Sequence, residues 1–205
     1  MPSKICKGRN IPLSEKNHGK RVAPQGRLGR LWADYGYLLV TVAVVFVLFR
    51  VILQLAWVPS GSMETTIPTR SLLVSLRLPY LAGDPEPERG DVVTFWSEEL
   101  NKLLVKRVVG LPGDEITFSG GDVYVNGEKL PEPYLPVQGQ TTVRGSSAFH
   151  VPEGSFFMMG DNRTGSEDSR FWAEPYVPAE AIRARTLLII SPYADSSWRG
   201  IRAVG

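Results

Sequence analysis

The chain has 205 residues, with 23 Lys and Arg residues against 21 Asp and Glu residues, and the charge is unevenly distributed. Residues 1–34 carry eight of the basic residues and only two acids, so this segment holds a net +6 of the total +2 and leaves −4 for residues 35–205. A chain without a basic face beyond its first segment is a poor partner for nucleic acid. A single cysteine, Cys6, and two isolated histidines, His18 and His150, exclude an internal disulfide and predict neither a catalytic metal nor a cofactor.

The first 58 residues predict a flexible basic tail over 1–34 and a transmembrane anchor over 35–58. The second segment is almost wholly apolar, and its length at ~1.5 Å per residue matches the ~30 Å hydrocarbon core of a bilayer. Arg50 and Gln54 interrupt it only near its end, where a long side chain can snorkel and Trp57 can lie among the headgroups. We therefore expect a single-pass protein of the cytoplasmic membrane.

The positive-inside rule places the basic tail in the cytoplasm and residues 59–205 on the outer face of the membrane. A cleaved secretory signal is the alternative, since residues 35–49 alone have the length of its apolar region. The charged leader is long for such a signal, and no Ala-x-Ala-like cleavage site follows. A buried core helix is a second alternative, but the basic flank favours a membrane anchor.

Residues 59–205 are enough for one domain with a core, and their pattern predicts a mostly β fold. The sequence Asn126-Gly127 between two short β-type runs predicts a hairpin with a type I′ turn. The proline-rich stretch 130–145 predicts an extended surface loop. Short runs of β-forming residues recur between turn signals at 72–76, 91–96, 103–109, 115–118, 123–125, 155–159 and 186–191.

A serine-rich turn follows the apolar segment directly, in the sequence Val-Pro-Ser-Gly-Ser-Met of residues 58–63. Gly61 and the preceding proline permit a tight turn that presents the Ser62 hydroxyl without a bulky neighbour. If the turn is extended, Ser60 lies on the same side, so one hydroxyl can attack while the other donates a hydrogen bond to an oxyanion. Taken alone, the motif is also compatible with an ordinary surface turn.

Lys106 lies within the apolar run 103–109, where alternate residues of a strand share one face. Leu104 and Val108 therefore point the same way as the lysine, and their apolar surroundings lower its pKa from ~10.4. A neutral lysine can act as the base that a serine nucleophile needs, and neither histidine has a suitable sequence context. The alternative is an edge-strand lysine that opposes aggregation.

Residues 160–170 are dense in turn formers and charges and follow an apolar run. We expect carboxylate–guanidinium pairs here, for instance Asp168 with Arg170 or Asp161 with Arg107. Hydroxyls of the same segment are candidates for orienting the lysine. The alternative is a solvated turn whose surface charges contribute little.

Together these blocks resemble the bacterial type I signal peptidases, membrane-bound serine proteases that remove signal peptides from exported preproteins. The family pattern Ser-Gly-Ser-Met-x-Pro-Thr-Leu is similar to residues 60–67, with Thr65 where proline is usual. Residues 89–95 resemble the family's Gly-Asp-Val strand, 106–114 its lysine block and 160–170 its Gly-Asp-Asn-Arg block. The resemblance runs in the family's order from the apolar segment to about residue 191.

The resemblance implies a β-rich catalytic domain with Ser62 as nucleophile and Lys106 as general base. It implies an oxyanion hole formed by the Ser60 hydroxyl and the Ser62 amide, with Ser166 holding the lysine amine. It also implies a supporting role for five residues around the site: Arg107, Asp161, Arg163, Asp168 and Arg170.

The partners that the resemblance implies are the lipid bilayer and preproteins with small residues one and three positions before the cut. Two other hypotheses keep the same fold. One is a dedicated processing protease for a specialised secretion or conjugation substrate, and the other is an inactive membrane-anchored homologue that acts as a binding module.

Overall fold

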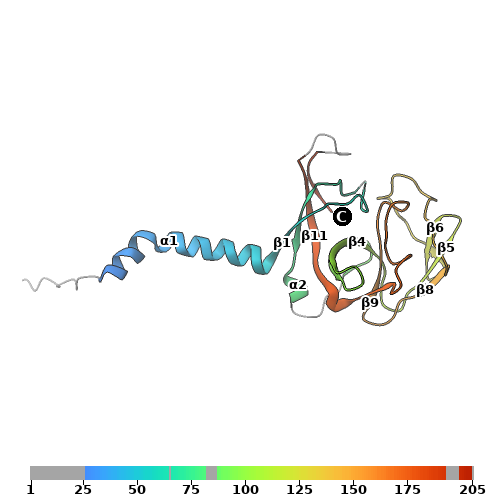
Figure 1. Cartoon of the computed structure of the whole chain (residues 1–205), viewed down its shortest axis with the longest axis horizontal. Helices are drawn as coiled ribbons and strands as arrows, with labels where there is room; N and C mark the ends of the chain where they lie inside the picture. Colours follow the sequence, from blue (N-terminus) through green and yellow to red (C-terminus); the bar gives the residue numbers. More distant parts are fainter. Residues whose placement is uncertain (1–25, 65, 82–86, 193–198, 205) are drawn as a thin grey trace, which may run out of the picture. The chain divides into compact units, whose positions relative to one another are not determined.

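The computed structural model describes residues 26–64, 66–81, 87–192 and 199–204. The chain divides into two compact units, Met1–Thr41 and Val42–Gly205, which are described separately. The described part of the first unit contains most of helix α1, and the second unit contains the end of that helix and the strands (Figure 1).

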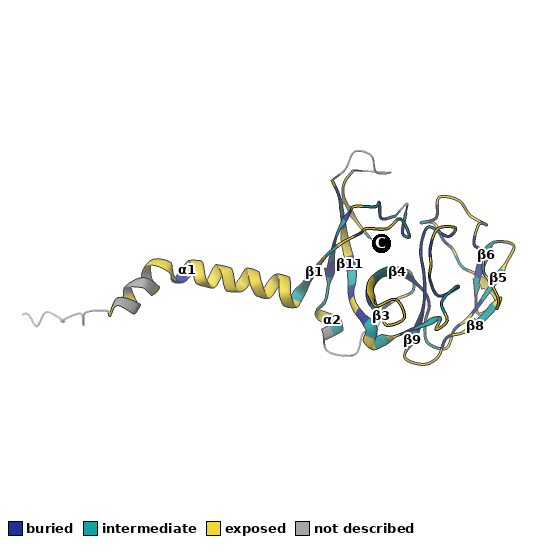
Figure 2. Cartoon of the chain, viewed as in Figure 1, coloured by how far each residue is buried: buried dark blue, intermediate teal, exposed yellow. Residues whose placement is uncertain are grey.

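Helix α1 covers Arg27–Val47 and passes into a π-helical segment, η1, at Leu48–Ile52. Within it, Asp34–Ile52 spans 19 residues with a mean hydropathy of 2.2, which is long and apolar enough to cross a membrane by length and composition. At ~1.5 Å per residue this stretch is about 28 Å long. Its large apolar side chains are exposed to the surroundings over most of the helix (Figure 2).

The ends of the predicted anchor were wrong. The helix begins at Arg27, inside the segment predicted as tail, and ends at Ile52 instead of residue 58. Strand β1, Leu53–Trp57, follows at once and pairs antiparallel with strand β2, Leu72–Leu76. A continuous apolar run fits either a helix or a strand, and here pairing with β2 decides the conformation. Residues 1–25 of the predicted tail lie outside the described residues.

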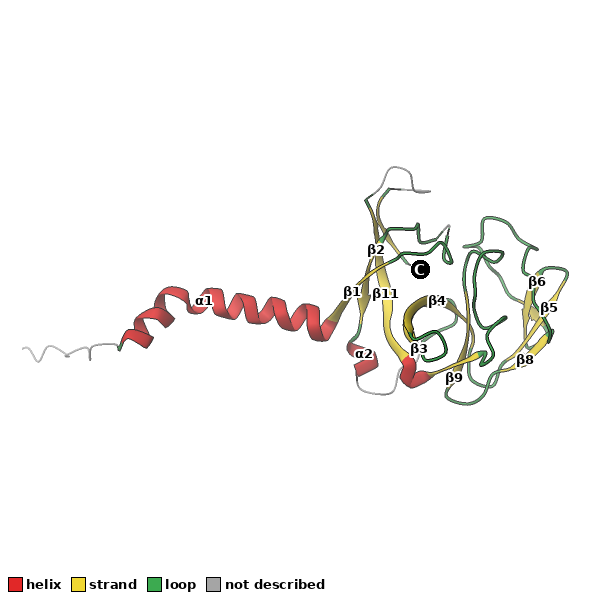
Figure 3. Ribbon diagram, viewed as in Figure 1, coloured by secondary structure: helices red, strands yellow, loops and turns green. Residues whose placement is uncertain are grey.

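The strands form two antiparallel sheets, as predicted for a mostly β fold (Figures 1 and 3). The larger sheet has the order β1-β2-β11-β3-β4-β9-β10, with β12 also pairing β11, and the smaller has the order β7-β6-β5-β8. Two short helical segments, α2 at Leu78–Leu81 and η2 at Ala179–Ala181, complete the fold. The remaining strands are β3 Val92–Ser97, β4 Lys102–Gly110, β5 Glu115–Ser119, β6 Asp122–Val125, β7 Glu128–Lys129, β8 Ala148–His150, β9 Ser155–Met159, β10 Tyr176–Pro178, β11 Ile182–Ser191 and β12 Gly200–Ala203.

All seven predicted strands are present, although β11 starts four residues earlier than the predicted run at 186–191. The hairpin is also confirmed, because β6 pairs β7 and the φ angles of Asn126 and Gly127 are +53° and +83°. Strand β7 is the second arm of that hairpin, and four strands were not predicted: β1, β8, β10 and β12. Apart from β1, they have four residues or fewer, which is too short for a periodic pattern to emerge.

Strands β4 and β9 lie between two core clusters, and this explains the continuous apolar sequence of β9. In β9, Phe156 and Met158 belong to the first cluster, and the alternating residues belong to the second. The buried members of the first cluster are Val93, Phe95, Val108, Phe156, Met158, Val177 and Ile182. Those of the second are Val109, Ile116, Val123, Val125, Val151, Phe157 and Met159. Side chains of β4 are therefore carried into the interior of the domain.

Candidate active site

Lys106 lies in the buried part of β4, opposite Val93 of β3. Leu104 and Val108, two residues away on either side, pack on the first cluster, so the lysine shares their face as predicted. The residue is only 2% exposed, and its Nζ donates a 2.8 Å hydrogen bond to Ser166 Oγ. Burial lowers the pKa of Lys106 from 10.5 to about 8, although the negative charge of Asp168 acts against this shift.

Ser62 lies in a turn that is anchored by the residue after it. Met63 and Ile67 are buried in the third core cluster, where they pack with Val58, Leu73, Val92 and Ile189. The Ile67 amide donates to the Met63 carbonyl at 2.8 Å, so the turn is closed behind the serine. This burial fixes the backbone beside Ser62, while Ser62 itself stays partly exposed. Thr65, where the family usually has proline, lies outside the described residues.

The serine turn is joined to the block 160–170 by hydrogen bonds across about one hundred residues of sequence. The Asn162 backbone amide donates to the Ser62 carbonyl at 3.1 Å, and Asn162 Nδ2 donates to the Gly61 carbonyl at 2.9 Å. Gly160 lies at the closest approach, because a Cβ there would overlap the Ser62 carbonyl and the Ser166 side chain. Sequence analysis gave no role to Gly160 or Asn162, although both belong to the quoted motif.

Ser62, Ser166 and the Lys106 amine are thus brought to one region, with Gly160 between the serines. Among the described residues, Lys106 Nζ bonds to Ser166, and no hydrogen bond joins it directly to Ser62 Oγ. Catalytic hydrogen bonds are often long in a free enzyme and tighten when substrate binds.

Two ion pairs hold the block 160–170 in place, and both were predicted. Arg107 donates two hydrogen bonds to the Asp161 carboxylate, at 2.9 and 2.7 Å. Arg170 donates two to Asp168, both at 2.8 Å, and both members of that pair have fully buried side chains. Burial alone would raise the pKa of Asp168, but the hydrogen bonds and charge of Arg170, with the Gly160 amide, hold it below its usual value.

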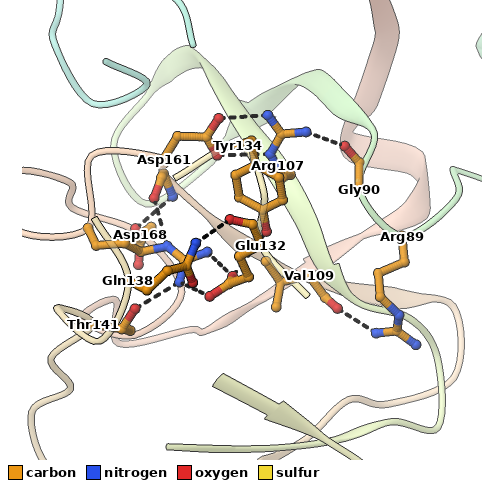
Figure 4. A network of polar contacts seen from close by, with 12 residues as sticks. Arg89, Gly90, Arg107, Val109, Glu132, Tyr134, Gln138, Thr141, Asp161 and Asp168 are labelled. Atoms are coloured by element: carbon orange, nitrogen blue, oxygen red, sulfur yellow. Dashed lines mark hydrogen bonds and ion pairs between the residues drawn. The ribbon is translucent and has the colours of Figure 1, made fainter. Parts of the chain in front are cut away.

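A third buried ion pair was missed. The Arg163 guanidinium pairs with the Glu132 carboxylate and also donates to Thr141 Oγ1 at 2.8 Å (Figure 4). The Arg107 guanidinium lies over the ring of Tyr134, 3.9 Å from its centre. Burial, followed by the negative charge of Glu132, raises the pKa of Tyr134, so its phenol stays protonated.

The stretch 130–145 is therefore not simply the surface loop that was predicted. Glu132, Leu135 and Thr141 are buried, because the segment lies against the guanidinium groups of the site. Proline-rich composition indicates an extended backbone, but it carries no information on what that backbone covers. The signal available in sequence was that the two predicted pairs left Arg163 without an assigned carboxylate, and a buried guanidinium needs one.

A cleft of about 300 Å³ opens beside the serine turn, between β1 and the first half of β4. Ser60, Ser62 and Met63 form one end of it. Its walls consist of residues 55–59 and of residues 102–105. Among the described strands, β1 pairs only with β2, and the β4 residues in the cleft pair only with β3. The cleft therefore lies between the outer edges of two strands.

A partly exposed serine in an anchored turn, a buried lysine of lowered pKa and an adjacent cleft form the arrangement that a serine–lysine hydrolase requires. The comparisons with known proteins agree. Residues 32–191 match the model of the family described as signal peptidase, peptidase S26. The chain belongs to this family and is a serine endopeptidase.

Two relatives illustrate the similarity. A probable signal peptidase I-2 of Synechocystis sp. is 32% identical over 171 residues, which cover 78% of this chain and 74% of the relative. Signal peptidase I of Leptolyngbya laminosa is 35% identical over 144 residues, covering 66% and 68%. A crystal structure of a signal peptidase I from Enterococcus faecalis shares 29% identity and a TM-score of 0.43, covering 49% of this chain and 97% of that one.

Proposed function

We propose that this signal peptidase cleaves the signal peptides of exported preproteins with Ser62 as nucleophile and Lys106 as general base. The observation that carries the proposal is the Lys106 amine, which is buried, has a pKa of about 8 and is linked to the serine turn through Ser166 and Gly160. Such an amine is neutral in about a tenth of the molecules at pH 7, far more than for an ordinary lysine with a pKa of ~10.4, and the neutral form is the one that a general base needs.

Acylation begins when Ser62 Oγ attacks the scissile carbonyl carbon and its proton passes to the neutral Lys106 amine. The tetrahedral intermediate then collapses, the C–N bond breaks, and the Lys106 ammonium returns the proton to the leaving amine. The mature protein departs, and the signal peptide remains as an ester of Ser62. In the second half, water attacks the ester carbon and gives a proton to Lys106. The ester C–O bond then breaks, the Lys106 ammonium returns the proton to Ser62 Oγ, and the signal peptide leaves as a carboxylic acid.

The oxyanion of each intermediate receives hydrogen bonds from the Ser60 hydroxyl and the Ser62 amide in this proposal. The Ser62 amide takes no part in the backbone hydrogen bonds of the turn, as far as the described residues extend, so it is free to donate. The Ser60 side chain lines the same cleft as Ser62. Donors that are held in place before the reaction stabilise the developing charge without further reorganisation.

Ser166 and the buried ion pairs act as positioning groups in this scheme. Ser166 holds Lys106 Nζ, while Asp168 fixes the Gly160 amide at 2.9 Å and so fixes the contact between the two serines. Asp161, with Arg107, and Arg163, with Glu132, keep the rest of the block folded. These pairs are buried and hydrogen-bonded, so removing one partner leaves an uncompensated charge.

The substrate lies in extended form along the cleft between β1 and β4. Backbone groups of the two strand edges pair with the residues before the scissile bond, and this main-chain pairing is largely independent of sequence. Small side chains one and three positions before the cut then face the same wall of the cleft, since alternate residues of a strand share a face. This alternation explains why small residues are needed one and three positions before the cut, while the residue between them is not restricted.

The apolar segment Asp34–Ile52 anchors the enzyme in the cytoplasmic membrane, with the β-rich unit on the outer face. We expect trypsin added to intact spheroplasts to digest the β-rich unit, whereas an epitope placed at the N-terminus is digested only after lysis. The opposite pattern of protection would reverse the topology. A cytoplasmic reporter protein that stays intact is the control for leakage.

The decisive experiment compares the parent protein with Ser62→Ala on a model preprotein that carries Ala at both specificity positions, in detergent micelles. We expect cleavage after the second Ala by the parent and none by the variant. Ser146→Ala is the matched control, because Ser146 is exposed and bonds only to Ala148 in the described structure. A folded parent that leaves the preprotein intact would favour the dedicated processing protease or the inactive homologue instead.

Cleavage should depend on pH in the direction set by Lys106. Because burial lowers the pKa of the amine to about 8, the neutral form predominates above that pH and is lost below it. The value of kcat/KM for the parent should therefore fall about tenfold for each pH unit below the pKa. A profile measured between about pH 6 and 10 that stays flat on its acidic side would exclude a base with this pKa.

A further inference from the structure

The largest apolar cavity described in the domain is separate from the Ser62 cleft. It has a volume of about 480 Å³ and shares no lining residue with the cleft. Residues 95–99, at the end of β3 and in the turn to β4, form one side. Residues 172–181, around β10 and η2, form the other. The mechanism proposed above uses none of these residues.

The walls of this cavity are aromatic. Trp96, Trp172 and Tyr176 line it, and Phe95 and Val177 of the first cluster form its buried base. The Phe95 and Trp172 rings meet edge to face, with centres 6.0 Å apart. Aromatic faces carry negative electrostatic potential and attract organic cations. The lining thus favours an occupant that has a flat or apolar body and carries a positive charge.

The rim of the cavity is acidic. Glu98, Glu99 and Glu174 are exposed around it, and none of the described residues that line the cavity is Lys, Arg or His. The Ala173 amide donates to Glu99 Oε1 at 3.5 Å, which holds the two sides of the rim together. Three carboxylates beside aromatic rings disfavour an anionic or uncharged partner and favour a cation.

An unpartnered hydrogen-bond donor belongs to Trp172, a residue that lines the cavity. The Trp172 Nε1 atom is buried and has no hydrogen-bond partner among the described residues. A buried indole N–H normally finds an acceptor, because leaving one without a partner is costly. A rotation of the ring toward the cavity would let a backbone carbonyl of a bound peptide supply that acceptor.

We propose that this cavity binds an arginine side chain presented by a polypeptide partner. The planar guanidinium stacks on the tryptophan rings and donates two parallel hydrogen bonds to a rim carboxylate, which an ammonium group cannot do. The peptide carbonyl beside the arginine accepts from Trp172. A choline headgroup would match the aromatic walls alone, and would leave both the carboxylates and the indole donor without hydrogen bonds.

The test is a titration of the full chain in micelles, ¹⁵N-labelled at tryptophan, observed by NMR. The chain has five tryptophans, and the Trp172 indole signal is assigned as the one absent from Trp172→Phe. The probes are the capped tripeptide Gly-Arg-Gly, its citrulline analogue, which is the neutral isostere, and choline. We expect the Arg peptide to shift the Trp172 signal with saturation, and the other two to leave it unchanged.

The matched variant is Glu98→Gln/Glu99→Gln/Glu174→Gln, which removes the rim charge at exposed positions. It should weaken Arg-peptide binding by about tenfold or more, the effect of losing one charge-assisted hydrogen bond. Cleavage of the model preprotein should be unchanged, because the cavity does not touch the Ser62 cleft. Equal binding of the citrulline peptide, stronger binding of choline, or no saturable shift with the Arg peptide would each overturn the proposal.

Discussion

Lys106→Met is expected to abolish preprotein cleavage while leaving the domain folded. Methionine has a similar unbranched shape and tolerates the apolar surroundings that lower the pKa of the lysine. It cannot accept the proton of Ser62, so kcat/KM should fall by about four orders of magnitude, the upper range for loss of a general base. Single-turnover cleavage of the model preprotein measures this directly.

Lys129→Met is the control for this substitution, because the Lys129 side chain lies exposed on β7 and, among the described residues, bonds to Asp122 alone. Its activity should equal that of the parent. Thermal unfolding of Lys106→Met should occur at the parent's temperature or above, since the substitution removes a buried ionisable group. A folded Lys106→Met protein with substantial activity would show that another group takes the proton of Ser62.

Asp168→Ala is expected to destabilise the domain more than any other charge deletion near the site. The Arg170 guanidinium would remain fully buried without its carboxylate, and the Gly160 amide would lose its acceptor. Removing one partner of a buried pair costs about 3–5 kcal/mol of unfolding free energy. Urea unfolding of the protein in micelles measures the loss, and preprotein cleavage should disappear with it.

Two variants separate this effect from a general sensitivity to lost charge. Asp122→Ala breaks the exposed pair with Lys129 and should leave unfolding nearly unchanged. Asp168→Asn keeps an acceptor for the Gly160 amide and should lie between the parent and Asp168→Ala. If Asp168→Ala unfolds at the same urea concentration as Asp122→Ala, the buried pair does not stabilise the site.

Features of the fold and of the site could be predicted from the sequence where a local residue pattern has a direct physical consequence. Alternation along β4 predicted that Lys106 is buried beside Leu104 and Val108, and the pKa lowered by burial follows from that position. The two ion pairs of the block 160–170 could be predicted because apolar neighbours shield its charged side chains from solvent. Such charges need partners of opposite sign. The Asn126-Gly127 hairpin required positive φ angles that few other residues adopt.

Features could not be predicted from the sequence where a contact between residues far apart in the chain decides the structure. Strand β1 continues the apolar run of the helix, and only its pairing with β2 distinguishes the two conformations. Glu132 lies in a proline-rich stretch that appears solvated, but its carboxylate pairs with Arg163, 31 residues away. Roles for Gly160 and Asn162 were missed because their contacts reach back to the serine turn.

The bond between the Ser62 carbonyl and the Asn162 amide joins segments that lie about one hundred residues apart in the sequence. Contacts of such long sequence separation form late in folding, because the intervening loop must close first. A chain whose synthesis has not reached residue 160 contains the serine turn and the lysine strand, but it lacks the block that bonds to the Ser62 carbonyl and to the Lys106 amine. The order of synthesis therefore delays assembly of the site until that block has been made.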